Sequence, residues 1–409
     1  MLFLGTNSRK IQVSRPRDDT LMCYFRYTMR NLTFYNAVTA IDQLFDWGWT
    51  YKSITIVNCT VGLDMSQGGH NGQSVGSVTF FDSAFSNVQV AFNTSHDATS
   101  LPPTAGSLII ENVSINNVPI VVRGPGKTTV LAGTTGPSTI AGWGQGHSYT
   151  PNGPVVFEGP ITPFNRPGSL LGGSGFYERS KPQYATTPVS QFLSTRSAGA
   201  KGDGVTDDTA ALQVVILTAA LTNKIVFFDA GTYKVTRTLF VPQNSKLVGE
   251  SYSRIMSSGD FFNNMKKPQP VVQVGRNGES GTVEWSDMIV STQGAQAGAI
   301  LIEWNLSSPG TPSGMWDVHT RIGGFTGSQL QLAQCPTTPT VSTPPAPVDP
   351  ACIAAYMSMH VTKQASGLYL ENCWFWTADH DLDDPTSTQI TIYTGRGLYI
   401  ESRTGTIWL

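Results

Sequence analysis

The amino-acid sequence predicts an all-β fold, made of two tandem parallel β-helices with a short helix capping the start of the second. Three observations predict it. Only 13% of the 409 residues are charged and 41 are glycine, which favours many short strands joined by turns over long solvated helices. A short apolar phrase recurs in the first third of the chain, and one helix signal stands near its middle.

The recurring phrase lies between residues 30 and 120. It reads "NLTFYN", "SITIVN", "SVTFFD" and "SLIIEN", and the copies end at Asn36, Asn58, Asp82 and Asn112. The spacings of 22, 24 and 30 residues, with one short strand per repeat, are typical of β-helix coils. A β-sandwich is the alternative, but its tight "NG" and "DG" turns are rare here. The residues expected to point inward are Leu32, Phe34, Ile54, Ile56, Val78, Phe80, Leu108 and Ile110.

The Asn and Asp residues that end these phrases have a structural and a functional interpretation. Asn and Asp tolerate left-handed backbone at coil corners, and their side chains can bond to the next coil. We therefore expect structural ladders of corner residues rather than ligands.

The changes in composition divide the chain into three parts. Residues 1–142 form a partial N-terminal β-helix, residues 143–195 a connection, and residues 196–409 a second β-helix. The connection is rich in Pro and Gly and has no period, but it is too aromatic for a floppy tether. The aromatic residues expected to dock on a domain are Phe176, Tyr177 and Tyr184.

The helix signal is "GAKGDGVTDDTAALQ", residues 199–213. Two glycines form a turn, Thr206 or Asp207 is a good N-cap, and the helix should extend to about Leu221. Such a helix would cover the open end of the second β-helix. The residues that begin its apolar face are Ala210, Leu212, Val214 and Val215.

Charge and hydropathy bound the partners. A net charge of −2 with no basic stripe makes nucleic acid an unfavourable partner, and no apolar run reaches 18 residues, so no membrane span is expected. No pattern predicts a cofactor, and we expect a monomer. No Cys-x-x-Cys pair or Cys/His cluster occurs, so a zinc site is not expected either.

Five cysteines are present. Cys335 and Cys352 flank a Pro/Thr-rich loop that either a disulfide closes or a reduced pair leaves open. The other three are expected to be buried thiols: Cys23, Cys59 and Cys373. Five Asn-x-Ser/Thr sequons weakly support secretion of the full-length protein: Asn31, Asn58, Asn93, Asn112 and Asn305.

The two ends of the sequence are unusual. The first residues lack a positive n-region and a small-residue cleavage site, so no signal peptide is predicted in this chain. The last residues, "GTIWL", stop within a predicted strand, which would leave an unpaired apolar edge. We expect a sequence truncated at both ends, and insoluble or inactive on its own.

Several residues are candidates for chemistry. The loop "TADHDLDD" places Asp379, His380 and Asp381 beside Trp374 and Trp376. It lacks the ligand spacing of a calcium loop, so it is either a solvated loop or a loop lining a sugar site, where indole faces stack on sugar rings.

Trp47 and Trp49 have the same two interpretations, core or sugar platform. Glu303 and Glu401 end apolar strands. Each is either a hydrogen-bonded corner residue or a carboxyl whose pKa burial raises towards that of a general acid.

Two levels of resemblance follow from these motifs. Residues 199–213 and the following "VFFDAGTYKV" resemble the opening segment of pectate-lyase-like β-helices, which identifies a fold and not a reaction. "FDWGWT" at 45–50, "ERSKPQY" at 178–184 and "WFWTADHDLDD" at 374–384 resemble fungal exo-β-1,3-glucanases of glycoside hydrolase family 55. The resemblance runs from about Met29 to Leu409.

The resemblance implies two right-handed β-helices and hydrolysis of β-1,3-glucan from the non-reducing end, with inversion and without a metal. Inversion needs an acid and a polarised water, held by groups roughly 6.5–9.5 Å apart. It implies that Thr50 positions the water, that a partner glutamine would fall near Arg26, and that the main general acid lies beyond Leu409, with Glu401 a lesser candidate. The rival is a glycan-binding or structural β-helix without that acid.

Overall fold

The computed structural model describes residues 11–13, 26–66, 75–100, 105–173, 175–338 and 347–409. Of residues 11–13, 26 and 27 it describes the backbone. The chain divides into two compact units, Met1–Tyr177 (unit 1) and Glu178–Leu409 (unit 2), and each is described by itself. No helix in the described ranges is long and apolar enough to cross a membrane.

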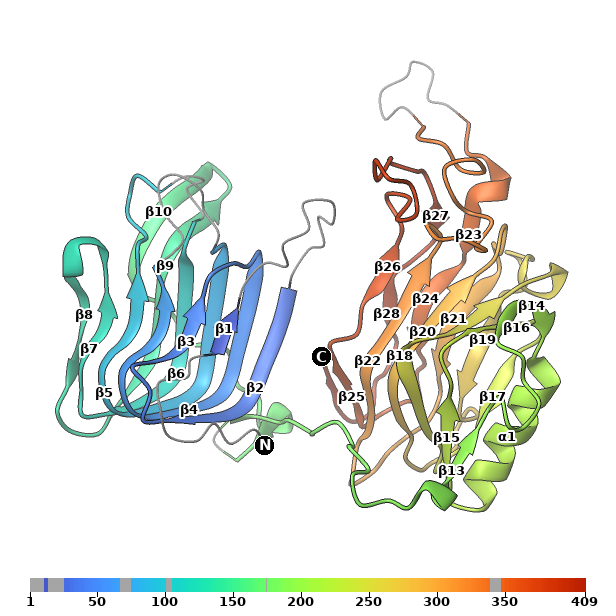
Figure 1. The fold of residues 1–409 in the computed structure, drawn as a ribbon, viewed down its shortest axis with the longest axis horizontal. Coiled ribbons are helices and arrows are strands. Elements are labelled where there is room, and N and C mark those ends of the chain that lie inside the picture. The colour runs from blue at the N-terminus through green and yellow to red at the C-terminus, as the bar shows by residue number, and fades with distance from the viewer. Residues whose placement is uncertain (1–10, 14–25, 67–74, 101–104, 174, 339–346) are drawn as a thin grey trace. The chain divides into compact units, whose positions relative to one another are not determined.

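Unit 1 is a stack of parallel β-coils (Figure 1). Strands β2, β4, β5 and β6 pair in parallel on one side, and β3, β4, β5 and β7 pair in parallel on another. Its elements are β1 (Ile11–Val13), β2 (Arg26–Tyr35), β3 (Thr39–Gln43), β4 (Gly48–Met65), β5 (Ser77–Thr94), β6 (Ser107–Asn116), β7 (Val118–Arg123), η1 (Pro125–Lys127), β8 (Thr129–Thr134), β9 (Ser138–Thr150), β10 (Gly153–Pro160), η2 (Gly168–Leu170), β11 (Leu171–Gly172) and β12 (Gly175–Phe176).

The parallel pairing confirms the predicted β-helical, all-β fold. The residues predicted to point inward are buried, apart from the half-buried Leu32 in the first described coil. The core also takes large aromatic side chains. Tyr51 and Phe80 pack between neighbouring coils with ring centroids 5.3 Å apart, and Phe80 and Phe92 of the same coil meet edge to face at 5.1 Å.

The corner residues form two ladders, which confirms the expected structural role of these Asn and Asp residues. Asn36, Asn58, Asn87 and Asn117 occupy one corner with φ between 54° and 57°, and the Asn58 and Asn117 amides donate to the preceding rungs at 2.6 and 2.9 Å. The second ladder consists of Asn31, Ser53, Asp82 and Asn112. The spacing of 24 residues from Asn58 to Asp82 therefore joins two corners, five residues apart on each coil, that favour the same residue types.

The last coil of unit 1 is closed by antiparallel strands. β8 pairs antiparallel with β7, β9 with β6, and β10 with β9. The hairpin β9–β10 extends to Pro160, so the sheet enters the segment 143–195 that we assigned to the connection. Glycine is required at two positions of this hairpin, because a Cβ on Gly142 would lie 2.7 Å from the Ile161 carbonyl oxygen and one on Gly144 would lie 2.8 Å from Ile109. These glycines interrupt the alternating pattern by which a strand is recognised in a sequence.

Residues 164–176 cover the outer face of unit 1 through a buried ion cluster. Arg166 bonds both carboxylate oxygens of Glu111, with Nε 3.1 Å from Oε1, and its Nη2 is 2.7 Å from Asp82 Oδ1. The Glu111 and Asp82 side chains are 1% and 3% exposed. Phe176 lies under the Arg166 guanidinium at 4.4 Å and donates its N–H to Asp82 at 2.8 Å. We call Arg166, Asp82 and Glu111 the Arg166 clamp.

Residues 179–184, at the start of unit 2, are held to the rest of that unit in a similar way. The Lys181 ammonium lies 2.8 Å from both Asp287 Oδ1 and Asp317 Oδ2, and we call these three residues the Lys181 clamp. Beside it, Glu284 accepts hydrogen bonds from Arg179 and from the Tyr184 hydroxyl. Phe176 and Tyr184 therefore pack on units 1 and 2, respectively, as expected for docked aromatic residues.

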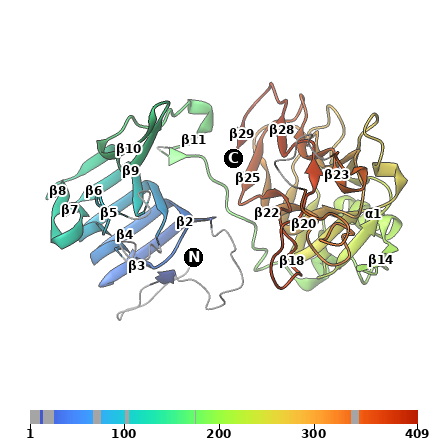
Figure 2. The ribbon, with the colours of Figure 1, turned by 90° about the horizontal axis from the view of Figure 1, so that it is seen from above.

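Unit 2 has three long parallel ladders and the short parallel pair β23–β27 (Figure 1 and Figure 2). The long ladders run β13–β15–β18–β20–β22–β25–β29, β14–β16–β18–β20–β22–β26 and β17–β19–β21–β24–β28. The strands before the middle of the unit are β13 (Phe192–Ser194), β14 (Asp203–Asp207), β15 (Ile225–Phe228), β16 (Thr232–Val235), β17 (Leu239–Val241), β18 (Lys246–Ser257), β19 (Gln269–Val274), β20 (Glu284–Thr292) and β21 (Ala299–Trp304). The later strands are β22 (Ser313–Ile322), β23 (Ile353–Ala355), β24 (Met357–Val361), β25 (Leu368–Glu371), β26 (Phe375–Thr377), β27 (Tyr393–Thr394), β28 (Leu398–Ile400) and β29 (Ile407–Trp408). The short helices are η3 (Val189–Gln191), η4 (Asp260–Phe262) and η5 (Pro350–Cys352).

Helix α1 (Thr209–Leu221) packs on the first strands of unit 2, as predicted. It buries Leu212, Val215, Ile216 and Ala219, whereas two residues of the predicted apolar face, Ala210 and Val214, are exposed. The N-cap is Asp208 and not the predicted Thr206 or Asp207. The Asp208 carboxylate accepts from the backbone N–H groups of Lys201 and Gly202 at 2.6 and 2.9 Å. Within residues 199–213, the side chain that precedes the helix therefore bonds to backbone N–H groups earlier in the same stretch, and the stretch continues into the capping helix.

Candidate functional site

An aromatic patch on unit 2 contains two of the predicted tryptophans. Pairing of β22 with β26 places Phe375 beside Thr320 and Trp376 beside Arg321. Trp374 directly precedes β26 and is 45% exposed, while Trp376 is half-buried. We call Trp374, Trp376, His319 and His380 the aromatic patch.

Two histidines hold the patch together. The Trp374 backbone N–H donates to His319 Nδ1 at 3.1 Å, and the two rings have centroids 5.9 Å apart at 64°. Burial lowers the pKa of His319, which favours the neutral imidazole. A neutral ring can accept the hydrogen bond from Trp374 at Nδ1. The His380 ring lies 5.7 Å from Trp376, and its Nδ1 is 2.7 Å from Asp379 Oδ1. The Asp379 side chain is 61% exposed, so the patch offers aromatic faces and a polar edge to solvent.

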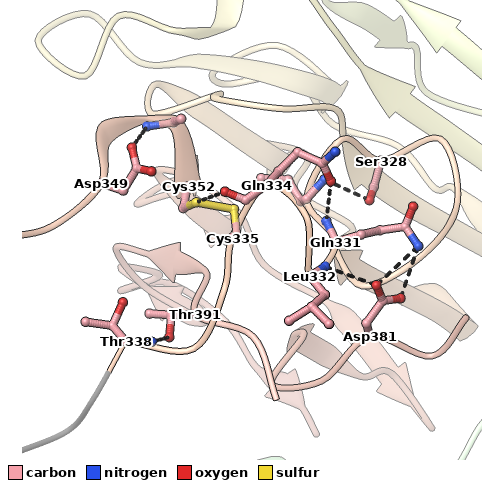
Figure 3. Close-up of a disulfide and its surroundings, with 12 residues drawn as sticks. Ser328, Gln331, Leu332, Gln334, Cys335, Thr338, Asp349, Cys352, Asp381 and Thr391 are labelled. Carbon is pink, nitrogen blue, oxygen red and sulfur yellow. Dashed lines mark hydrogen bonds between the residues drawn. A yellow bond between two sulfur atoms is a disulfide. The ribbon is translucent and has the colours of Figure 1, made fainter. Parts of the chain in front are cut away.

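Asp381, by contrast, is a structural residue. It is buried, and its carboxylate accepts from Gln331 Nε2 at 3.1 Å and from the N–H groups of Leu332 and Asp383 at 3.0 and 3.1 Å (Figure 3). Although burial opposes ionisation, these hydrogen bonds lower its pKa. With its carboxylate facing the protein, Asp381 does not fit the predicted substrate-binding role.

Glu401 has an environment opposite to that of a general acid. Its Oε2 lies 2.7 Å from His360 Nε2, and Tyr399 donates to Oε1 at 3.3 Å. The hydrogen bond from His360 lowers the pKa of Glu401, whereas an acid working near neutral pH needs a raised pKa. The structure therefore favours the interpretation of Glu401 as a hydrogen-bonded corner carboxylate. Glu303 is similar, because it accepts from Gln273 and Asn305 at 2.9 Å each.

The "FDWGWT" motif lies on unit 1, and its two tryptophans differ. Trp47 precedes β4 and is 49% exposed, whereas Trp49 within β4 is 9% exposed and belongs to the core. The proposed sugar platform at Trp49 is therefore wrong, and Trp47 stays a candidate. Thr50, half-buried, alternates with the buried Trp49 and Tyr51 and stands in an outward row with Thr28 and Thr79. The side chain of Arg26, near the predicted glutamine position, lies outside the described residues.

A buried polar network, missed in the sequence, lies beneath Trp47. Gln43 donates to Asp46 Oδ2 at 3.0 Å and accepts from the Tyr51 hydroxyl. Asp46 Oδ1 accepts from the N–H groups of Gly76 and Ser77 at 3.2 and 3.0 Å. Burial raises the pKa of Asp46 to about 7. The network anchors residues 76–77 to the turn that carries Trp47.

The remaining predicted sites are the cysteines and the glycosylation sequons. Cys335 and Cys352 form a disulfide, and Cys59 and Cys373 are free thiols (Figure 3); Cys23 lies outside the described residues. Of the sequons, Asn31 and Asn58 are exposed, but Asn305 is buried and its amide donates to the Gly275 carbonyl. Within the described ranges, no three His, Cys, Asp or Glu side chains are arranged to hold a metal ion.

His319, Arg321 and Asp46 are site residues that sequence reasoning missed or assigned to the background. His319 and Trp374 are 55 residues apart, and only the strand register brings them together. A signal for Asp46 did exist, since it is an acid within a strongly apolar motif.

Comparison with known proteins agrees with this fold. A family model described as rhamnogalacturonase A/epimerase, pectate lyase-like, matches residues 21–64 and 192–307. A glucan 1,3-beta-glucosidase of Cochliobolus carbonum is 50% identical over 386 residues, which cover 94% of this chain and 48% of that protein. A probable glucan endo-1,3-beta-glucosidase of Arthroderma benhamiae is 37% identical and covers 94% of this chain and 54% of that protein. The chain thus spans about half the length of these relatives.

Among solved structures, sacteLam55A from Streptomyces sp. SirexAA-E matches 91% of this chain and 55% of that one, at 12% identity and a TM-score of 0.34, which is too low to place any residue. The fold and the family model define a pectate-lyase-like β-helix protein. The chain is a homologue of the Cochliobolus glucan 1,3-beta-glucosidase, in agreement with the resemblance of its motifs to family 55 exo-β-1,3-glucanases.

Proposed function

We propose that the protein containing this chain hydrolyses β-1,3-glucan. The observation that carries the proposal is the 50% identity with a glucan 1,3-beta-glucosidase across 94% of the chain. The aromatic patch supports it, because an exposed indole next to a half-buried one, with a carboxylate at the edge, is a surface suited to the flat faces and hydroxyls of a glucan.

The finer features of the proposal are attack from the non-reducing end, inversion and independence from metals. Thr50 would position water, and Trp47, Trp374, Trp376, Asp379 and His380 would contact substrate. Because Glu401 is bonded to His360 with a lowered pKa, we assign it no acid role. We also propose that the protein is secreted, since the Cys335–Cys352 disulfide is favoured in an oxidising compartment, and that it is a monomer.

The test is incubation of this chain with laminarin, with glucose release followed by proton NMR of the fresh product. Release of α-glucose that chelator leaves unchanged is the expected result. Trp374→Ala should weaken laminarin binding about tenfold, equivalent to about 1.4 kcal/mol. Tyr252→Ala is the matched control, because Tyr252 is a 78% exposed aromatic residue of unit 2 outside the patch.

Binding without release would favour the second candidate, a glycan-binding module. That candidate has its own support, because two of the predicted site carboxylates of unit 2, Asp381 and Glu401, are held by the protein with lowered pKa values. Absence of both binding and release would overturn the proposal for this chain.

A further inference from the structure

The side chains behind Trp376 form a stack of alternating cations and rings. The Arg254 guanidinium lies 3.9 Å from the ring centre of Phe325. Arg321 lies 5.1 Å from the same ring and 5.6 Å from that of Trp376. Beyond Trp376, the His380 ring follows at 5.7 Å. The stack therefore leads from β18 across β22 to β26.

The two arginines reach Phe325 from different strands. Arg254 stands on β18 and Arg321 on β22, with β20 between them. In register, Arg254 pairs with Ile289 and Ile289 with His319, so Arg321 stands two residues further along its strand. Both guanidinium groups contact the Phe325 ring, at 3.9 and 5.1 Å from its centre.

A tight turn delivers Phe325 to this position. Gly323 and Gly324, directly after β22, have φ of 75° and 70°, a conformation that favours glycine. A Cβ on Gly324 would lie 2.6 Å from the His380 carbonyl oxygen. Asp383 accepts from the N–H and hydroxyl of the next residue, Thr326. Phe325 is 4% exposed, so the turn presents a buried ring to the two arginines.

The arginines are held mainly by these ring contacts. Arg321 donates from Nη2 to the Gly324 carbonyl at 2.9 Å, and Arg254 from Nη1 to Thr232 at 3.3 Å. Both Nε atoms are buried, and no described residue offers either of them a hydrogen-bond acceptor. Partial hydrogen bonding leaves the tilt of each guanidinium plane to be set by the rings.

We propose that Arg321, held by Phe325 and Arg254, is a positioning residue that fixes the indole of Trp376 for contact with a glucan. The inference rests on the proposed function, because it assigns a role to the back of the same patch. Arg321 reaches Trp376 from β22 and does not itself belong to the exposed aromatic faces. It acts by removing the freedom of the half-buried indole before substrate arrives, which lowers the entropy cost of binding.

The test compares Arg321→Met with Arg321→Lys in binding of laminarihexaose by calorimetry. Arg321→Met should weaken binding about tenfold, and Arg321→Lys should lose part of that, because an ammonium stacks less well than a guanidinium. The matched control is Arg276→Met, which removes a cation 5.0 Å from the Phe240 ring elsewhere on unit 2 and should leave binding unchanged.

A double-variant cycle distinguishes positioning from general destabilisation. If Arg321 acts through Trp376, then Arg321→Met combined with Trp376→Phe should bind no worse than Trp376→Phe alone. Losses that multiply, or an Arg321→Met variant that binds like the wild type, would overturn the proposal. If Arg321→Met fails to fold, the same cycle is read with Arg321→Lys.

A second measurement needs no ligand. The Trp376 contribution to the near-ultraviolet circular dichroism, taken as wild type minus Trp376→Phe, should shrink in Arg321→Met and persist in Arg276→Met. If the wild type fails to bind laminarihexaose while this signal behaves as expected, the glucan function fails but the positioning of Trp376 stands. If the signal is unchanged in Arg321→Met, the positioning role is overturned whatever the ligand.

Discussion

The Arg166 clamp and the Lys181 clamp share one arrangement of charges and differ in their exposure to solvent. In each, a basic side chain reaches carboxylates at or next to left-handed corners: Asp82 in unit 1, and Asp287 and Asp317 in unit 2, with φ of 52°, 59° and 54°. The Arg166 clamp is nearly dry, with acids 1% and 3% exposed, whereas the Lys181 clamp has side chains 20% to 32% exposed. Equal geometry therefore carries unequal energy, because burial decides how strongly each charge depends on its partner.

Removing the arginine of the Arg166 clamp should have the largest effect on stability. Arg166→Ala leaves Asp82 and Glu111 buried without their cation, and we expect the free energy of unfolding to fall by about 3–5 kcal/mol. Urea denaturation of the full chain, with hydrogen exchange of β5 and β6, measures the loss where it occurs.

A second substitution checks the cause. Adding Glu111→Gln to Arg166→Ala removes one stranded charge and should restore part of the stability. If the double variant is less stable than Arg166→Ala, loss of packing under Phe176 and not an uncompensated charge explains the result.

The buried carboxyl of Asp46 extends the comparison to pH. Its pKa is raised from 3.8 to about 7 in the folded protein by burial, so the folded state holds the proton more tightly than the unfolded state. The resulting stability is fully present below about pH 4 and is lost as pH rises through about 7. The loss is on the order of 4 kcal/mol, at about 1.4 kcal/mol per unit of pKa.

The measurement is the free energy of unfolding of wild type and Asp46→Asn between pH 4 and 8. Only the difference in slope is read, since the amide also alters the contact with Gln43. Wild type should lose stability relative to Asp46→Asn as pH rises. Parallel curves would mean that Asp46 titrates at its ordinary pKa.

Removing the lysine of the Lys181 clamp should reduce stability much less. Lys181→Ala is expected to reduce stability by about 1 kcal/mol or less, because solvent screens side chains this exposed. Raising the salt concentration should shrink the difference between Lys181→Ala and wild type further, while leaving the Arg166→Ala loss nearly intact. A Lys181→Ala loss equal to that of Arg166→Ala would break the argument that burial separates the clamps.

The features predicted correctly from sequence are those that depend on neighbouring residues. The helix at 209–221 is signalled by its turn glycines and its apolar residues, and the coils by short apolar phrases. The predicted ladders of corner residues are confirmed, but the repeat did not separate two corners of one strand, marked by Ser53 and Asn58, because both are compatible with Asn or Asp. The hairpin β9–β10 was missed because glycines replace the alternating side chains that normally reveal a strand.

The candidate site was predicted less well, because exposure and register are tertiary properties. Trp47 and Trp49 share a parity, yet only Trp49 lies within β4, so alternation does not apply to the pair. Trp374 and Trp376 were predicted as candidates for a sugar site, but the contacts behind them come from β22, 55 residues earlier for the His319–Trp374 bond. No pattern within either segment encodes that pairing.

The smallest expected effect concerns glycosylation, which separates sequons by exposure. Asn305 is buried and donates to Gly275 and Glu303, and Asn93 bonds Asp64 and Arg123, so a glycan on either would displace ladder contacts. Asn58 is exposed, but its amide donates to Asn36 in the corner ladder, whereas Asn31 is exposed in unit 1. Peptide mass mapping of protein produced through the secretory pathway of a host cell should therefore find glycan on Asn31 and none on Asn305. Modification of Asn305 would show that its coil differs from the one described, because the amide nitrogen cannot carry a sugar while it is buried against the Gly275 carbonyl.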